Sequence, residues 1–198
     1  LPEPKSSITG VETDGLGASS KPLAVGALAK LLHTDLRPHA ARIAVTALHW
    51  LALNDSTGRR RVVRQCGALG PLVHVMGASD DVDVLKSATC AIAILACHEA
   101  NKEALCELGC VEALCAPLRC RWPEEPPADE PPGCMEQPLT GVLAALAALG
   151  KGNEATVLRC GVLPDIVRCV TADSELTAAS VTLLGMLSQD PQVKEEVR

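Results

Sequence analysis

Ten cysteines are the most reactive side chains of this 198-residue chain, and their spacing bears on metal binding. Structural zinc is held by close cysteine pairs, such as two cysteines separated by two residues, with a second pair nearby. The densest group here comprises Cys106, Cys110, Cys115 and Cys120, with His98 upstream. Its gaps of three, four and four residues make no such pairs, and Gly109 breaks the helix that would align the thiols. We therefore expect no metal site, and a zinc-binding protein is the weaker alternative.

The adjacent Cys97 and His98 raise the question of nucleophilic catalysis. A catalytic histidine has to face the thiol whose proton it accepts. Neighbouring residues of a helix instead point about 100° apart and do not face each other. The sequence also lacks a serine–histidine–aspartate pattern, a phosphate-binding glycine loop and a paired-carboxylate motif. We therefore expect a protein that is not an enzyme and that uses no cofactor.

A cluster of basic residues follows the turn at residues 54–58, and it comprises Arg59, Arg60, Arg61 and Arg64. Such a cluster is suited to a phosphate or an acidic peptide. The simpler interpretation is the solvated face of a short helix, because one charge run is weak evidence for a site. The net charge of −6 gives no general attraction to nucleic acid, so we expect no nucleic-acid partner.

The other cysteines fit a packed interior better than a set of disulfides. Thiols such as Cys90, Cys115 and Cys169 fall inside apolar helical patterns, without the spaced framework of a small secreted domain. Free cysteines of this kind behave as small buried hydrophobic residues. No apolar run approaches the ~20 residues that span a bilayer. We therefore expect a cytoplasmic protein in a reducing compartment, without a membrane span.

These residues are carried by a helical unit that recurs along the chain. The start of its second helix, Gly67-Ala-Leu-Gly-Pro-Leu-Val73, matches Gly109-Cys-Val-Glu-Ala-Leu-Cys115 and Gly161-Val-Leu-Pro-Asp-Ile-Val167. Each match follows a short first helix and precedes a long third helix, which ends in a Leu-x-x-Leu or Ile-x-x-Leu step. A period of ~40 residues built from helices alone is typical of an α-solenoid.

The three helices per unit, the glycine that opens the second helix and the ending of the third helix resemble armadillo repeats. The resemblance covers about residues 22–198, and it implies an all-α, right-handed α-solenoid that binds other proteins. We place the units at about residues 22–54, 55–97, 98–150 and 151–188, with a partial fifth unit at 189–198.

The resemblance also implies that the third helices line a concave face. In peptide-binding members of the family this face carries a ladder of Asn side chains, each with a Trp one turn before it. The Asn positions are occupied here by Trp50, Ile94, Ala148 and Met186, and the Trp positions by Thr46, Cys90, Ala144 and Thr182. Neither ladder is present, so importin-type binding of nuclear signals is not expected, because capture of an extended backbone needs amide side chains. Either the face is an apolar trough for an amphipathic helix or another subunit, or the register is shifted and these residues are core.

The candidate partner-binding residues on this face are Trp50, Thr46, His49, Cys90, Ile94 and Met186. Trp50 is the main candidate, because it is rotated about 200° from Leu48 on the helix and Trp is enriched at binding hot spots. We expect a non-enzymatic scaffold or adaptor that binds a partner segment on the concave face. The alternative is a helical segment of a larger assembly factor, co-chaperone or cytoskeletal complex subunit. Burial between units is expected for Leu51, Leu95, Leu149 and Leu187, which recur at one step of the third helices.

Two segments fall outside the helical pattern. Residues 1–21 are rich in Pro, Ser and Gly and predict a flexible lead-in before a helix that starts at Pro22. Residues 121–137 are rich in Pro and acidic residues and interrupt the third unit, with Trp122 at their root as a secondary binding candidate. We interpret this insertion as a tolerated surface loop. The alternative is an acidic docking segment or a lid over the groove.

Overall fold

The computed structural model describes residues 14–34, 38–53, 63–79, 81–120, 136–171 and 175–189. These ranges contain helices and turns and no strand, which confirms the predicted all-α fold. The helices are α1 (Asp14–Thr34), α2 (Pro38–Leu53), α4 (Leu69–Ala78), α5 (Val82–Leu95), α6 (Glu99–Glu107), α7 (Cys110–Cys120), α8 (Glu136–Gly150), α9 (Glu154–Arg159), α10 (Leu163–Thr171) and α11 (Glu175–Leu187).

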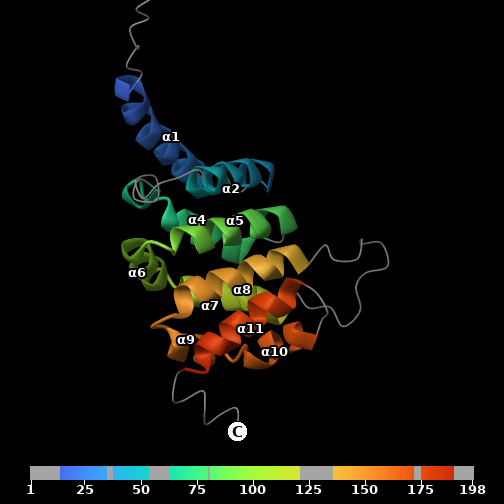
Figure 1. Ribbon diagram of the computed structural model, residues 1–198. Helices are drawn as coiled ribbons and strands as arrows, with labels where there is room; N and C mark the ends of the chain where they lie inside the picture. The colour runs from blue at the N-terminus through green and yellow to red at the C-terminus, as the bar shows by residue number, and fades with distance from the viewer. Residues whose placement is uncertain are drawn as a thin grey trace, which may run out of the picture.

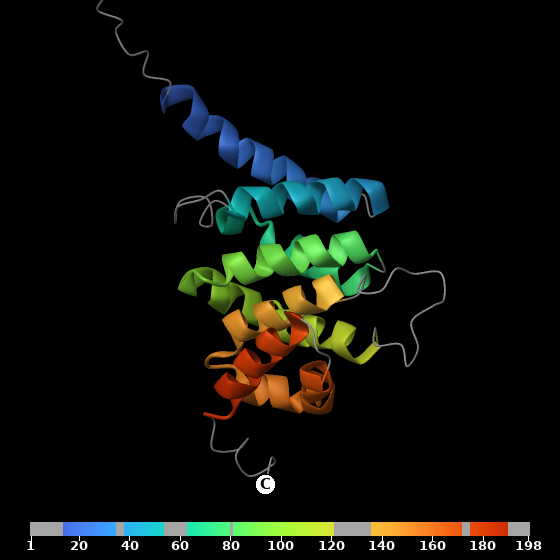
Figure 2. The same cartoon turned by 45° about the vertical axis from the view of Figure 1, so that its right-hand side comes forward.

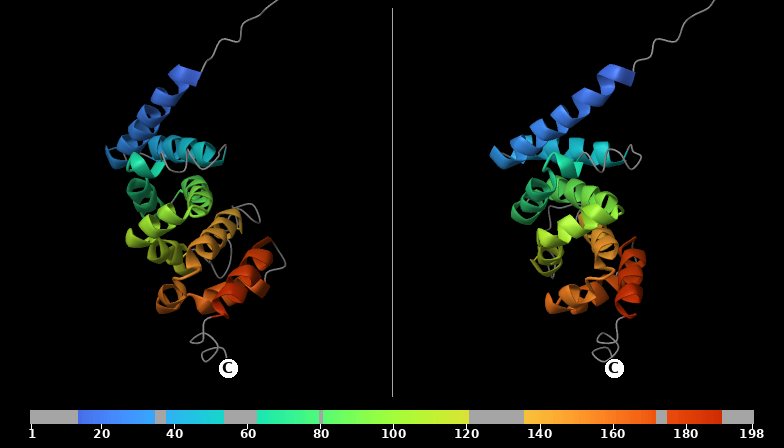
Figure 3. Two further views of the ribbon diagram at one scale, coloured as in Figure 1. Left: turned by 60° about the vertical axis from the view of Figure 1, so that its left-hand side comes forward. Right: turned by 90° about the vertical axis from the view of Figure 1, so that its left-hand side faces the viewer.

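The helices stack as a solenoid of two layers (Figures 1 and 2). The third helices of the units, α2, α5, α8 and α11, pack side by side in chain order and form one layer. The second helices, α1, α4, α7 and α10, form the other layer, as the two views of Figure 3 show. The short first helices α6 and α9 lie at the edge and pack against the second-helix layer. This order is the one that the repeat pattern predicts.

The glycines that open the second helices have a left-handed backbone conformation. Gly67, Gly109 and Gly161 have φ values of 69°, 71° and 66°. A side chain on Cβ makes this left-handed region costly, and glycine enters it without a steric penalty. The chain therefore turns at each of these glycines, and the next residues start the second helix.

The α5 helix is capped by an aspartate. Its N-cap is Asp81, and Asp80 before it lies outside the described residues. Asp81 Oδ1 accepts hydrogen bonds from the backbone N–H groups of Asp83 at 2.9 Å and Val84 at 3.2 Å. Val82 is therefore the first helical residue, and these bonds satisfy two N–H groups that have no partner within the helix.

The first helix of the structure is longer than the sequence predicts. It begins at Asp14, so residues 14–21 belong to α1 and not to a flexible lead-in, and Pro22 lies inside it. Proline removes one backbone hydrogen bond from a helix, which weakens the helix but does not have to end it. Pro22 is also held by the second unit, because the Cys66 thiol donates a hydrogen bond to its carbonyl oxygen at 3.3 Å. Residues 1–13 lie outside the described part.

The predicted interface leucines are fully buried in the later units. Leu95, Leu149 and Leu187 are each 0% exposed, as predicted. Leu51 is only half-buried, so the prediction is wrong for the first unit. In later units this flank of the third helix packs against the third helix before it, and α2 has no such helix before it in the described ranges. Burial of this leucine thus depends on the neighbouring unit.

The third helices α5 and α8 approach each other closely at Gly141. A Cβ placed on this residue would overlap the Thr89 hydroxyl and lie 3.5 Å from Cys90 Sγ. Thr89 is buried, and its hydroxyl donates to the Leu85 carbonyl oxygen at 2.9 Å, so it has little freedom to move. The missing side chain at Gly141 is therefore what allows the two helices to pack so closely.

Several predicted segments lie outside the described residues. They are most of the insertion (residues 121–135, with Trp122), the basic residues Arg59, Arg60 and Arg61, and the partial fifth unit from residue 190 onward. The end of the insertion is corrected, because α8 begins at Glu136 and so includes the last two residues of the predicted range 121–137.

Candidate protein-binding groove

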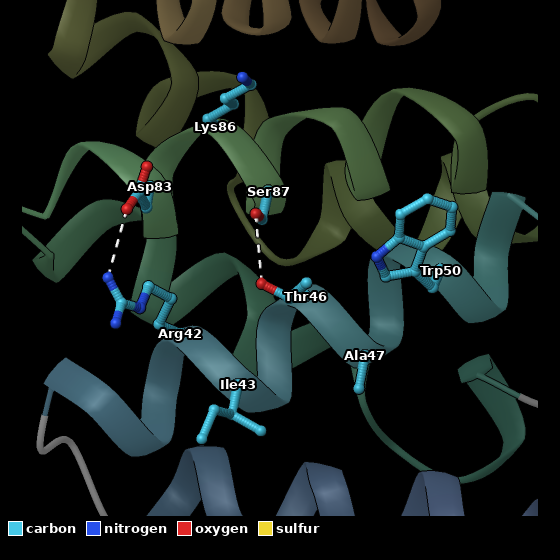
Figure 4. A pocket seen from close by; sticks show the side chains of 8 residues that line it. All are labelled: Arg42, Ile43, Thr46, Ala47, Trp50, Asp83, Lys86 and Ser87. Carbon is cyan, nitrogen blue, oxygen red and sulfur yellow. Dashed lines mark hydrogen bonds and ion pairs between the residues drawn. The ribbon is translucent and has the colours of Figure 1, made fainter.

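The groove with the clearest chemical character runs between the third helices of the first two units, α2 and α5. It has a volume of about 580 Å³. Its lining comes from α2 (Arg42, Ile43, Thr46, Ala47 and Trp50) and from α5 (Asp83, Lys86 and Ser87). Figure 4 shows that Arg42, Thr46 and Trp50 rise toward α5, whereas Ile43 and Ala47 point away from it. We call this feature the α2–α5 groove.

One end of the α2–α5 groove is polar. Arg42 Nη1 lies 3.3 Å from Asp83 Oδ2, and both side chains are exposed, at 45% and 66%. An exposed ion pair of this kind contributes little stability, typically about 0–1 kcal/mol, so it can rearrange when a partner arrives. Next to it, the hydroxyls of Thr46 and Ser87 lie 3.5 Å apart and share a hydrogen bond (Figure 4).

Lys86 supplies a second cation to this end of the groove. Its side chain is exposed and lies one turn before Cys90 on α5. Burial raises the pKa of the Cys90 thiol, and the Lys86 ammonium offsets part of this rise. The positive charge of Lys86 therefore reaches the Cys90 position, where peptide-binding relatives carry their Trp according to the predicted alignment.

The other end of the groove is aromatic. Trp50 is 58% exposed, which agrees with the prediction that it points away from the core. Its ring meets the His49 ring edge to face, with centroids 6.0 Å apart and an interplanar angle of 72°. Burial lowers the pKa of His49, so the imidazole is held in its neutral form near pH 7. An exposed Trp that packs against a neutral ring presents a large apolar surface, and fixing its side chain on binding costs little conformational entropy.

The remaining predicted residues of the column are only partly available. Thr46 lines the groove, whereas Cys90, Ile94 and Met186 are half-buried. Ile94 and Met186 pack against the core, and the tip of Met186 lies over Gly150 of α8. The predicted apolar column is therefore well exposed at Trp50, whereas its members in later units are largely covered by neighbouring side chains.

The prediction from sequence missed the charged residues of the groove, although a signal for them was present. Arg42 and Lys86 occupy equivalent positions in successive units, because the offset of 44 residues that pairs Trp50 with Ile94 also pairs Arg42 with Lys86. Applying the alignment one further turn toward the start of each helix would have identified both cations.

A second groove lies at the equivalent place between α8 and α11. It has a volume of about 430 Å³ and is lined by Thr140, Ala144, Ala147, Ala178, Ala179 and Thr182. It carries neither a charge nor an aromatic ring, so it has fewer means of selecting a partner than the α2–α5 groove.

Of the eight described cysteines, Cys110, Cys115 and Cys169 lie in the packed interior, four are half-buried and Cys97 is exposed, so the prediction of buried thiols holds only in part. Within the described ranges, no three His, Cys, Asp or Glu side chains come close enough to hold a metal ion. Cys110 and Cys115 are fully buried, and burial raises the pKa of the Cys110 thiol to about 12. Burial is also the main cause that raises the pKa of Cys115, with neighbouring Cys160 adding to it. These thiols are therefore protonated and poorly nucleophilic at neutral pH.

Two further predicted features are only partly visible. Arg64 is exposed, and it is the one member of the basic cluster within the described residues. None of the helices seen in the described ranges combines the length and the apolar character needed to cross a membrane.

Comparison with known proteins agrees with this architecture. The family model of the armadillo/beta-catenin-like repeat matches residues 56–97, which coincide with the predicted second unit. A computationally designed armadillo repeat protein for modular peptide recognition superposes with a TM-score of 0.71, at 22% identity over 87% of this chain and 68% of that chain. The chain therefore has the fold of an armadillo-repeat solenoid.

Two other solved structures give the same picture of this armadillo-repeat solenoid. A second designed armadillo repeat protein has a TM-score of 0.72 at 21% identity, over 89% of this chain and 70% of that one. A designed armadillo repeat protein in complex with the peptide (KR)4 has a TM-score of 0.68 at 21% identity, over 85% of this chain and 66% of that one. The solenoid thus spans about two thirds of the length of these solved chains. No curated protein sequence matches the chain.

Proposed function

We propose that this armadillo-repeat solenoid is a non-enzymatic scaffold that binds a segment of a partner protein on its third-helix layer, with the α2–α5 groove as the main contact. The observation that carries the proposal is the 58% exposure of Trp50 at the edge of this groove. Tryptophan is among the residues most enriched at binding hot spots, where one side chain often supplies 2 kcal/mol or more. The free thiols of the described cysteines support a reducing, cytoplasmic setting for this binding.

The groove lining also supports a scaffold role more than a catalytic one. Its polar groups are an ion pair, a shared hydroxyl hydrogen bond and a lysine, and none of them forms a nucleophile–base pair. A protein partner is favoured over nucleic acid, because the chain carries a net charge of −6.

The test is the Trp50→Ala variant against a matched control on the same helix. Leu53 is 49% exposed near the end of α2 but does not line the groove, so Leu53→Ala removes a comparable apolar surface from a neighbouring place. Binding of a purified partner, measured by calorimetry, should weaken by about 2 kcal/mol or more for Trp50→Ala, roughly thirtyfold. Leu53→Ala should change the affinity by less than about threefold.

Tryptophan fluorescence gives an independent readout of the same site. With Trp122 replaced by Phe, acrylamide quenching reports on Trp50 alone, since the chain has two tryptophans. Quenching should be efficient in the free protein and reduced in the complex. Equal affinity losses in the two alanine variants, or unchanged quenching on binding, would place the contact elsewhere.

A further inference from the structure

The α2–α5 groove holds charged side chains of both signs at its polar end. Asp83, in the first turn of α5, is the one acid of its lining. The cations Arg42 and Lys86 share the groove with it. The groove lining is therefore net positive by one charge, two cations minus one acid, although the whole chain is at −6.

We propose that the α2–α5 groove takes an acidic amphipathic helix of a partner protein. This inference rests on the proposed function and names the chemistry of the partner. An apolar side chain of the helix packs against Trp50, and carboxylates two turns away on the same face meet Arg42 and Lys86. Arg42 and Trp50 are eight residues apart on α2, a separation of about 12 Å along the helix axis. The partner therefore carries its apolar and acidic groups at positions i and i+7 or i+8.

A helix fits the groove better than an extended peptide does. An extended backbone leaves its N–H and C=O groups to be satisfied by the receptor, for which amide side chains are well suited because they both donate and accept hydrogen bonds. The lining of the α2–α5 groove contains no Asn or Gln, and its hydroxyls, those of Thr46 and Ser87, already bond to each other. A helix satisfies its own backbone and presents only side chains, which an apolar groove accepts.

The charged side chains of the α2–α5 groove favour a partner helix with an acidic face over one with a basic face. The groove lining offers two cations, Arg42 and Lys86, and one carboxylate, Asp83, which lies 3.3 Å from Arg42. This exposed ion pair is weak enough to rearrange for either kind of ligand. An arriving carboxylate therefore finds two cations, whereas an arriving lysine finds one acid and two like charges. We therefore expect this groove not to bind the basic peptide (KR)4, with which a designed armadillo repeat protein forms a complex.

The experiment compares two labelled helical peptides that differ only in charge. Each carries a pair of leucines and, seven and eight residues away on the same face, either two glutamates or two lysines, and (KR)4 is the third probe. Fluorescence anisotropy should show the glutamate peptide binding at least tenfold more tightly than the lysine peptide at low salt. This ratio should shrink as salt is added, because exposed charges are screened within about 10 Å at 0.1 M.

Charge reversal makes the assignment specific. Arg42→Glu and Lys86→Glu together should invert the preference, so that the lysine peptide becomes the tighter ligand. Arg119→Glu is the matched control, because Arg119 is an exposed cation on the second helix α7, outside the groove lining, and this change should leave the preference intact. Circular dichroism checks that each variant keeps its helix content.

The outcomes separate this inference from the proposed function. If the lysine peptide binds as well as the glutamate peptide, or the double reversal leaves the preference unchanged, the acidic-helix inference is overturned. If Trp50→Ala still weakens both peptides in that case, the groove remains the binding site and the proposed function stands. Binding of the glutamate peptide that Trp50→Ala does not weaken would overturn both.

Discussion

The third helices α5 and α8, which have another described third helix on each side, bury both of their flanks. The third helices at the two ends of the described stack, α2 and α11, bury one flank each. The flank that α2 buries is the one that α11 leaves partly open. In α5, Leu95 on one flank and Ile92 on the other are both 0% exposed. At the equivalent places, α2 buries Leu48 but leaves Leu51 half-buried, and α11 buries Leu187 but leaves Leu184 half-buried. Both apolar residues of the Leu-x-x-Leu or Ile-x-x-Leu step are therefore buried in an interior helix, whereas one of the two is half-buried in a helix at either end of the stack.

The second helices show the same contrast, because those at the two ends of the stack expose opposite flanks. Val73 of α4 and Cys115 of α7 are buried, whereas the equivalent Val167 of α10 is 49% exposed. At the other end, Leu72, Leu114 and Ile166 are 0% exposed, and the equivalent Leu28 of α1 is half-buried. Each unit of a solenoid contacts only its neighbours. A unit that has a neighbour on one side only, within the part of the chain that the structure describes, therefore exposes its other face there.

The largest effect is expected from truncating an interior leucine. Leu95→Ala removes a fully buried side chain and should lower the free energy of unfolding by roughly 2–5 kcal/mol. Leu51→Ala, at the equivalent but half-buried place on α2, should cost less than about half of that, since less surface leaves the core. Urea denaturation followed by circular dichroism measures both. Equal losses of stability would mean that Leu51 and Leu95 are equally buried in solution, and they would contradict the contrast between interior and end helices.

Thiol labelling at equivalent positions should reveal the same contrast through a rate. Val167→Cys places a thiol on the open face of α10, where the equivalent Cys115 of α7 is buried with a raised pKa. The thiolate is the reactive form, and a raised pKa keeps Cys115 protonated through neutral pH. At pH 8 the new thiol should react with iodoacetamide at least about a hundredfold faster than Cys115, as mass spectrometry of the digest reports. Comparable labelling rates would show that position 167 of α10 and position 115 of α7 are equally buried.

Two glycines on third helices should respond to alanine with opposite signs. At Gly141 the added methyl group meets Thr89 across the interface of α5 and α8, and such overpacking costs typically about 1–3 kcal/mol. At Gly185 of α11 a Cβ has nothing within 4 Å, so alanine should stabilise the helix by up to about 1 kcal/mol. Thermal melts of both variants decide the point. A stabilising Gly141→Ala would show that α5 and α8 are not in close contact there.

The smallest effect is expected from the proline- and acid-rich insertion. Replacing residues 123–135 by a short Gly-Ser linker should leave the melting temperature nearly unchanged, because each doubling of a flexible loop costs only about 0.6 kcal/mol. Differential scanning calorimetry of the two chains measures the change. A large loss of stability would mean that the insertion packs on the body of the solenoid.

Much of the architecture followed from local sequence. The recurring glycine and the apolar spacing predicted the all-α solenoid, and the helical phase of α2 predicted the outward position of Trp50, because backbone preference and helical phase are properties of a few neighbouring residues. The start of α1 was misplaced by the same local reasoning. At Pro22, packing of the helix against Cys66 adds a contact that no local rule contains.

The tertiary structure alone decided which flank of each helix is buried and which side chains form the α2–α5 groove. Leu51 and Leu95 belong to the same motif, yet only Leu95 has a third helix stacked on that flank. Arg42, Asp83 and Lys86 are unremarkable charges in the sequence, and they become one polar site because α2 and α5 lie side by side. A helix determines the phase of its own side chains, whereas burial and site geometry arise from residues ~40 positions away in the next unit, which local patterns do not specify.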